Sequence, residues 1–70
     1  MNDYLSGLAR MADQIGRNFA TRPADEAVAG IAEHLERFWD PSMRRDLADA
    51  AAAGRVNVSA VVGKALESLS

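Results

Sequence analysis

The stretch HLERFWDPSMRRDL, residues 34–47, decides how the chain is divided into helices. The residue before a proline is pushed out of the helical region, whereas Asp and Pro are favourable at the first positions of a helix. The step Asp40-Pro41 therefore predicts that one helix ends and another begins here. The same stretch contains the only tryptophan and two adjacent arginines, Arg44 and Arg45, which a helix boundary does not explain.

Before this boundary, apolar residues recur every three or four positions, a spacing that places them on one face of a helix. The two stripes are Leu5, Leu8, Ala12, Ile15 and Phe19, and then Ala24, Ala27, Val28, Ile31, Leu35 and Phe38. Pro23 separates them, because proline is unfavourable inside a helix but suits its first turn. The pattern predicts helices at about residues 3–20 and 23–39.

After the boundary, a third stripe consists of Met43, Leu47, Ala50 and Ala51. The run ADAAAAG ends at Gly54, a favourable left-handed C-cap, and Asn57 is suited to cap a further helix. The valines that follow would also suit a short strand, but a lone strand has no pairing partner and their spacing is helical. We expect helices at about residues 41–53 and 57–69.

These elements predict an all-α fold, a small bundle of three to four short helices that forms a single domain over residues 1–70. A chain of 70 residues buries only about 60% of the surface that its unfolded form exposes. Small domains of this size often need a disulfide, a metal or a partner, and the chain has no cysteine. A partner is the remaining way to stabilise so thin a core.

The charge of the chain argues against several classes of protein. Its formal net charge is −2, so no overall positive field attracts nucleic acid or an anionic membrane. No apolar run approaches the roughly 18 residues of a membrane span, and the first residues lack the basic and apolar regions of a signal peptide. We therefore expect a cytoplasmic protein that binds neither nucleic acid nor membrane.

His34 is the only histidine and the first residue to consider for chemistry. Catalysis would require an acid or a nucleophile beside it, and a metal site would require further ligands. Glu33 and Glu36 point elsewhere on the predicted helix, and the glycines are isolated rather than grouped in a phosphate-binding loop. We expect no catalytic, metal-binding or cofactor-binding residue, and therefore no enzyme activity in this chain.

Trp39, Arg44 and Arg45 each admit two interpretations. A large aromatic side chain closes a small core well, but Trp and Arg are also over-represented among the residues that dominate binding. The arginines lie in the first turn of the predicted third helix, where the helix dipole disfavours cations. They are either solvated or paired within the chain, for instance Arg45 with Asp49, or they contact a carboxylate on another chain.

Two segments, RMADQIG at residues 10–16 and AVAGIAEHLERFWDPSMRR at residues 27–45, resemble the small delta subunit of soluble NAD-dependent, molybdenum-containing formate dehydrogenases. The resemblance implies a non-catalytic accessory subunit without a cofactor of its own. It also implies larger partner subunits, above all the molybdenum-containing one. Those subunits would carry molybdenum bis-pterin guanine dinucleotide, iron-sulfur clusters and FMN, and would use NAD.

We therefore expect the chain to bind this complex and to stabilise it, or to assist its assembly and cofactor insertion. The residues expected to contact the partner are His34, Phe38, Trp39, Pro41, Met43, Arg44 and Arg45. Two alternatives belong to other classes of protein. One is a small helical nucleic-acid-binding regulator that reads with its third helix, and the other is a helical structural protein that self-associates.

Overall fold

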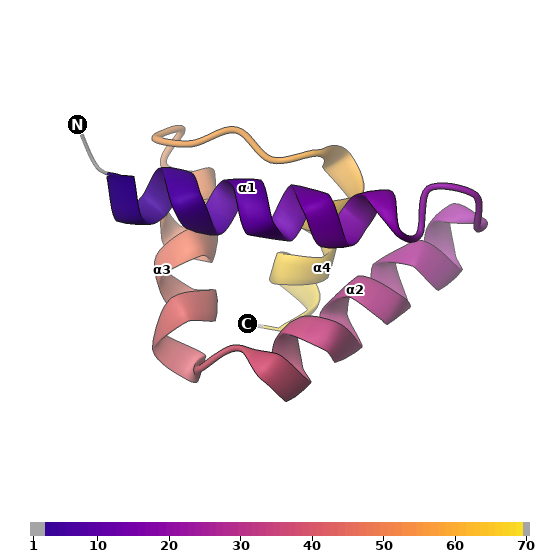
Figure 1. The fold of residues 1–70 in the computed structure, drawn as a ribbon. Coiled ribbons are helices and arrows are strands. Elements are labelled where there is room, and N and C mark those ends of the chain that lie inside the picture. The colour runs from indigo at the N-terminus through magenta and orange to yellow at the C-terminus, as the bar shows by residue number, and fades with distance from the viewer. Residues whose placement is uncertain (1–2, 70) are drawn as a thin grey trace.

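The structure is a computed structural model that describes residues 3–69, and this part of the chain contains helices but no strand. The helices are α1 (Asp3–Arg17), α2 (Ala24–Phe38), α3 (Pro41–Ala52) and α4 (Ala60–Ser68). The predicted all-α bundle is confirmed. In Figure 1, α1 crosses one side of the bundle, and the connection between α3 and α4 runs alongside α1 in the same direction.

The helix boundaries at the two prolines agree with the sequence to within one residue. Pro23 is the N-cap of α2, and Pro41 is the first residue of α3 after Asp40 at the N-cap. The side chain of Asp40 accepts no capping hydrogen bond, so its contribution is the extended backbone that precedes proline. Gly54 ends α3 in the left-handed conformation (φ 76°), as its position predicts.

The first helix is shorter than predicted, because it ends at Arg17 rather than at residue 20. Residues 18–20 instead form turns, in which Phe19 N–H donates to the carbonyl of Gly16 at 3.0 Å. The ring of Phe19 lies directly over Gly30 of α2, where a Cβ atom would overlap with it. The glycine thus accommodates an aromatic ring at the turn between α1 and α2.

The last helix begins at Ala60, three residues later than predicted, and its N-cap is Ser59 rather than Asn57. Ser59 Oγ accepts a hydrogen bond from the backbone N–H of Val62 at 3.5 Å. The backbone N–H of Ser59 donates to Asp13 Oδ1 of α1 at 3.0 Å. This bond joins residues 46 positions apart, so the periodicity around Asn57 contained no sign of it.

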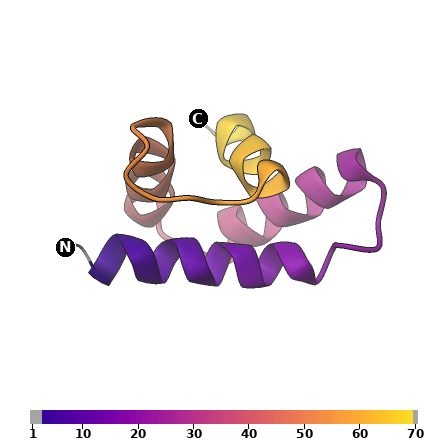
Figure 2. The same ribbon diagram turned by 90° about the horizontal axis from the view of Figure 1, so that it is seen from above.

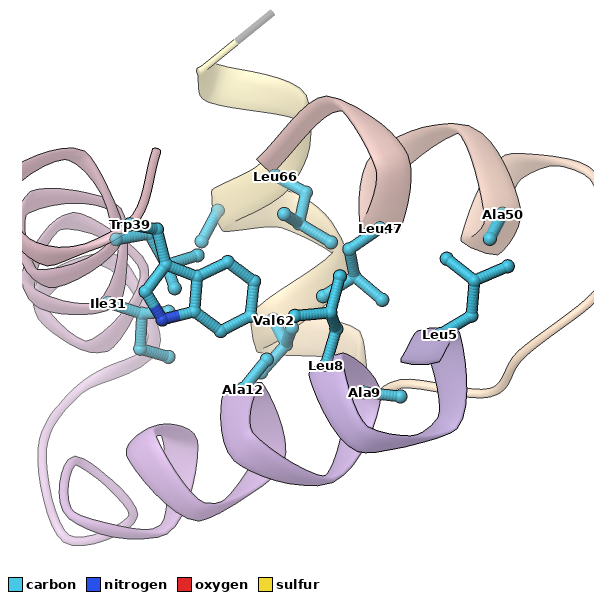
Figure 3. Close-up of a cluster of buried hydrophobic side chains, with 12 residues drawn as sticks. Leu5, Leu8, Ala9, Ala12, Ile31, Trp39, Leu47, Ala50, Val62 and Leu66 are labelled. Carbon is cyan, nitrogen blue, oxygen red and sulfur yellow. The ribbon is translucent and has the colours of Figure 1, made fainter. Parts of the chain in front are cut away.

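All four helices contribute to one hydrophobic core. Its most completely buried large side chains are Ile31, Leu35, Leu47 and Val62. Leu5, Leu8 and Ala12 cover them from α1, and Figure 3 shows this cluster together with the indole of Trp39. Among the predicted stripe residues, Ala24, Phe38 and Ala51 are not in the core. The largest of them is Phe38, whose side chain is 68% exposed at the end of α2.

Tyr4 links the start of α1 to α3. Its hydroxyl donates a hydrogen bond to Asp46 Oδ2 at 2.9 Å, between two exposed side chains. This hydrogen bond, together with slight desolvation and the charge of Asp46, raises the pKa of Tyr4 above its ordinary value of 10.0. The neutral phenol is the donor, so the stabilisation is present below pH 10 and is lost as the pH rises through the raised pKa.

We therefore expect the tyrosine titration of the folded chain to have its midpoint above 10.0. Tyr4 is the only tyrosine, so the ultraviolet absorbance of tyrosinate reports this group alone. Asp46→Asn removes the nearby charge, and should lower the midpoint toward that of the unfolded chain. Equal midpoints in the wild type and in Asp46→Asn would contradict the role of this contact.

Candidate functional site

The residues expected to contact a partner meet where α2 turns into α3. We call this region the α2–α3 corner; it comprises His34, Phe38, Trp39, Pro41, Met43, Arg44 and Arg45. Only Trp39 and Asp40 separate the two helices, and both have extended backbone conformations. The short connection keeps the end of α2 close to the first turn of α3, as Figure 1 shows.

Trp39 is part of the core, with only 7% of its surface exposed. In Figure 3 its indole extends from the end of α2 toward Val62 and the side chains of α1. The indole Nε1 makes no hydrogen bond within residues 3–69. Every fully buried side-chain nitrogen or oxygen in this part of the chain has a hydrogen-bond partner, so Nε1 is not fully buried. The indole N–H therefore keeps contact with water, while the ring closes the core at the corner.

Arg44 binds the end of α2 from within the chain. Its guanidinium Nη1 donates to the carbonyl of Glu36 at 3.0 Å and approaches the carbonyl of Leu35 at 3.5 Å. Carbonyls at the end of a helix have no partner within the helix and carry the negative end of its dipole. The dipole of α3 disfavours a cation in its first turn, and the contact of Arg44 with the last carbonyls of α2 compensates for this.

Arg44→Ala should lower the free energy of unfolding by about 1 kcal/mol, because α2 loses a charged donor at its last turn. Arg45→Ala is the matched control, since this neighbouring side chain is exposed and should change stability by less than about 0.5 kcal/mol. Urea unfolding followed by far-ultraviolet circular dichroism measures both variants. Equal effects would show that the bonds to α2 do not stabilise the fold.

Arg45 differs from Arg44 in having no partner within the described chain. It forms no hydrogen bond or ion pair with any residue of 3–69, so the alternative that it pairs with Asp49 is wrong. Its guanidinium is exposed beside Pro41, which is exposed as well. The α2–α3 corner therefore exposes one positive charge, that of Arg45, which has no partner within the described residues.

Phe38 is the largest exposed apolar side chain of the corner. Its ring lies 4.7 Å from that of His34, measured between centroids, with the two planes tilted by 43°. His34 is half-buried, and Met43 is partly buried against the core. An exposed aromatic ring held beside a second ring has the composition of a protein-binding surface.

His34 belongs to no metal-binding group in the described part of the chain. Among residues 3–69, no three side chains of His, Cys, Asp or Glu lie close enough together to hold a metal ion. None of the helices in this part of the chain is long and apolar enough to cross a membrane. The interactions that the structure shows at the corner are apolar contact, ring stacking and a charged hydrogen bond.

The structure also contains a surface that the sequence did not indicate. A groove between α3 and α4 is lined mainly by small residues, including Ala48, Ala52 and Gly63. The alanine-rich run of α3 was the only signal for it, because such a helix has little surface to bury in the core. Periodicity does not reveal which other helix forms the second wall.

The comparisons with known proteins give one match. A family model described as NADH-dependent formate dehydrogenase delta subunit, FdsD, matches residues 7–66. The match includes the whole α2–α3 corner and most of α4. Comparison with curated proteins gave no match. Comparison with solved structures gave none either.

Proposed function

The chain belongs to the family of NADH-dependent formate dehydrogenase delta subunits, and from this premise we propose that it is a non-catalytic accessory subunit. It binds the larger subunits of the enzyme, above all the molybdenum-containing one, through the α2–α3 corner. The observation that carries this assignment of the surface is Phe38, whose ring is 68% exposed although the domain buries most of its other large apolar side chains.

Within the corner, the residues divide by exposure. Phe38, Pro41 and Arg45 are exposed and meet the partner, and half-buried His34 supports the ring of Phe38. The remaining corner residues, Trp39, Met43 and Arg44, hold this surface in place through the core and the end of α2. Fixing an aromatic side chain before binding lowers the entropy lost on association.

An accessory subunit acts on its partner through differential binding. A chain that binds the cofactor-loaded or assembled conformation more tightly than other conformations shifts the population toward it. This accounts for stabilisation of the complex, and for assistance in assembly or cofactor insertion, without chemistry in the small chain. Molybdenum bis-pterin guanine dinucleotide, iron-sulfur clusters and FMN would all lie in the larger subunits, which use NAD.

The resemblance to the soluble formate dehydrogenases supports a cytoplasmic location. The arginines of α3 also favour protein subunits over nucleic acid as partners. Arg44 donates a hydrogen bond to the end of α2, so Arg45 is the one arginine of α3 without a partner in the described chain. A nucleic-acid-binding stripe would need several free cations on one face. Self-association is the alternative function. Sedimentation of the isolated chain as a dimer would support it.

The test is co-purification of the larger subunits with a tagged copy of this chain. Phe38→Ala should reduce their recovery about tenfold or more, because a central aromatic contact typically contributes over 1.4 kcal/mol to binding. The molybdenum content of the purified large subunit should fall in parallel if the chain assists cofactor insertion.

Met11→Ala is the control, since Met11 is also apolar and 48% exposed but lies on α1, outside the corner. It should leave recovery at the wild-type level. If Phe38→Ala and Met11→Ala give the same recovery and molybdenum content as the wild type, the corner is not the contact surface.

A further inference from the structure

The connection between α3 and α4, residues 53–59, crosses the bundle beside α1, as Figure 2 shows from above. We call this segment the strap. Its valines, Val56 and Val58, are partly buried against the core. Its last residue, Ser59, donates its backbone N–H to Asp13 Oδ1 of α1 at 3.0 Å. The strap is thus attached to α1 at the point where α4 is about to begin.

Ser59 supplies one half of a capping box. In this motif the N-cap side chain accepts from the backbone N–H of the third helical residue, and a Glu or Gln at that position accepts from the N-cap N–H. Ser59 Oγ accepts from the N–H of Val62, but a valine side chain cannot return the bond. The carboxylate of Asp13 takes its place. The cap of α4 is therefore completed by a different helix.

The close approach of α1 to this cap depends on Gly16, which lies three residues after Asp13 and is buried. A Cβ atom at Gly16 would lie 3.1 Å from Val62 Cγ2 and 3.8 Å from Ser59 Oγ. The first of these distances is shorter than an ordinary van der Waals contact. Glycine is unfavourable inside a helix relative to alanine, and here it lets the first turn of α4 pack directly on α1.

The strap also contains a second residue that is suited to start α4. Asn57 is as favourable as serine at an N-cap, and Val58 would then continue the apolar stripe of α4 at the spacing of Val61 and Val62. An N-cap side chain accepts from the N–H of the second or third helical residue, and Ser59 would be the second. Bonding of the Ser59 N–H to Asn57 would exclude its bond to α1. The structure leaves residues 57–59 outside the helix.

We infer that Asp13 selects the start of α4 from two alternatives. While Asp13 holds the N–H of Ser59, α4 begins at Ala60. When this bond is lost, Asn57 becomes the N-cap, and Val58 and Ser59 join the helix. Each of these two residues then spans about 1.5 Å instead of about 3.4 Å, so the strap shortens. The device passes a change at α1 to α4 as a discrete change of helix length, and it does not depend on the proposed function.

The test uses nuclear magnetic resonance of the full chain labelled with ¹³C and ¹⁵N. Asp13→Ala removes the acceptor, and Asp13→Asn is the matched control that keeps an oxygen in its place. The Cα chemical shifts of Val58 and Ser59 should be non-helical in the wild type and predominantly so in Asp13→Asn. In Asp13→Ala their helical fraction should rise about fivefold or more, because a hydrogen bond to a charged acceptor shifts such an equilibrium about tenfold.

A second variant tests the role of Asn57. Asp13→Ala combined with Asn57→Ala removes both the acceptor on α1 and the alternative cap, and should return Val58 and Ser59 to non-helical shifts. Unchanged shifts in Asp13→Ala would overturn the inference, and so would a helical gain that persists without Asn57. Near-ultraviolet circular dichroism of Trp39 reports whether each variant is folded. Global unfolding of Asp13→Ala would also overturn it, since the contact would then hold the whole domain rather than the start of one helix.

Discussion

Trp39→Ala is expected to lower the free energy of unfolding by about 3–5 kcal/mol, the usual range for loss of a buried large aromatic side chain. A domain of this size has a total stability of roughly 4–10 kcal/mol, at about 0.05–0.15 kcal/mol per residue. The variant should therefore be partly or fully unfolded at ambient temperature. The physical reason is that the indole fills the space between α2 and the rest of the core.

Phe38→Ala provides the matched control, one position earlier in the chain. Because its ring is 68% exposed, its removal should change stability by less than about 0.5 kcal/mol. Thermal unfolding followed by far-ultraviolet circular dichroism measures both variants. If Trp39→Ala were as stable as Phe38→Ala, the indole would not be a core residue.

This contrast also separates folding from binding. Trp39→Ala should lose the partner because the domain unfolds, whereas Phe38→Ala should lose it while remaining folded. Only the second result locates a contact surface. Interaction measurements on Trp39 variants therefore need a folding control before they are interpreted.

Leu47→Ala is the second large effect, expected at about 2–5 kcal/mol. Leu47 is fully buried, and Ala50, the other buried residue of α3, has little surface to contribute. Met43 and Ala48 add only partly buried side chains, so Leu47 is the one large side chain of α3 that is fully buried in the core. Without it, the cavity left behind and the lost contacts should detach the helix that forms both the corner and the groove.

The same substitution at Leu69 tests whether burial decides the effect. Leu69 is only partly buried at the end of α4, so Leu69→Ala should cost clearly less, about 1 kcal/mol. Chemical denaturation at equilibrium gives both values. A cost for Leu69→Ala equal to that for Leu47→Ala would contradict the conclusion that burial decides the size of the effect.

The helices themselves were accessible from the sequence, because the interactions that define them are short in range. Periodicity located all four helices, and Asp40-Pro41 and Gly54 fixed the ends of α3 to within one residue. The resemblance carried by residues 10–16 and 27–45 agrees with the family match over residues 7–66. Each of these signals lies in neighbouring residues or in a contiguous pattern.

The errors fall where distant segments meet. Helix α1 stops early where Phe19 turns over Gly30, and α4 begins late where Ser59 binds Asp13 of α1. Phe38 continues the apolar spacing of α2, but α2 ends at this residue, and the neighbouring side chain of Trp39 packs into the core instead. A helical wheel gives the direction of a side chain but not whether anything covers it.

The sequence alone thus determined the all-α class, the approximate limits of the helices and the resemblance to the family, and left their number at three or four. The tertiary structure decided how the corner residues divide: Trp39 into the core, Arg44 onto the carbonyls of α2, and Phe38 and Arg45 toward solvent. It also created the groove between α3 and α4, whose two walls are separate segments of the chain. The physical reason is range: helix propensity and capping act over three or four residues, whereas burial depends on which helices pack together.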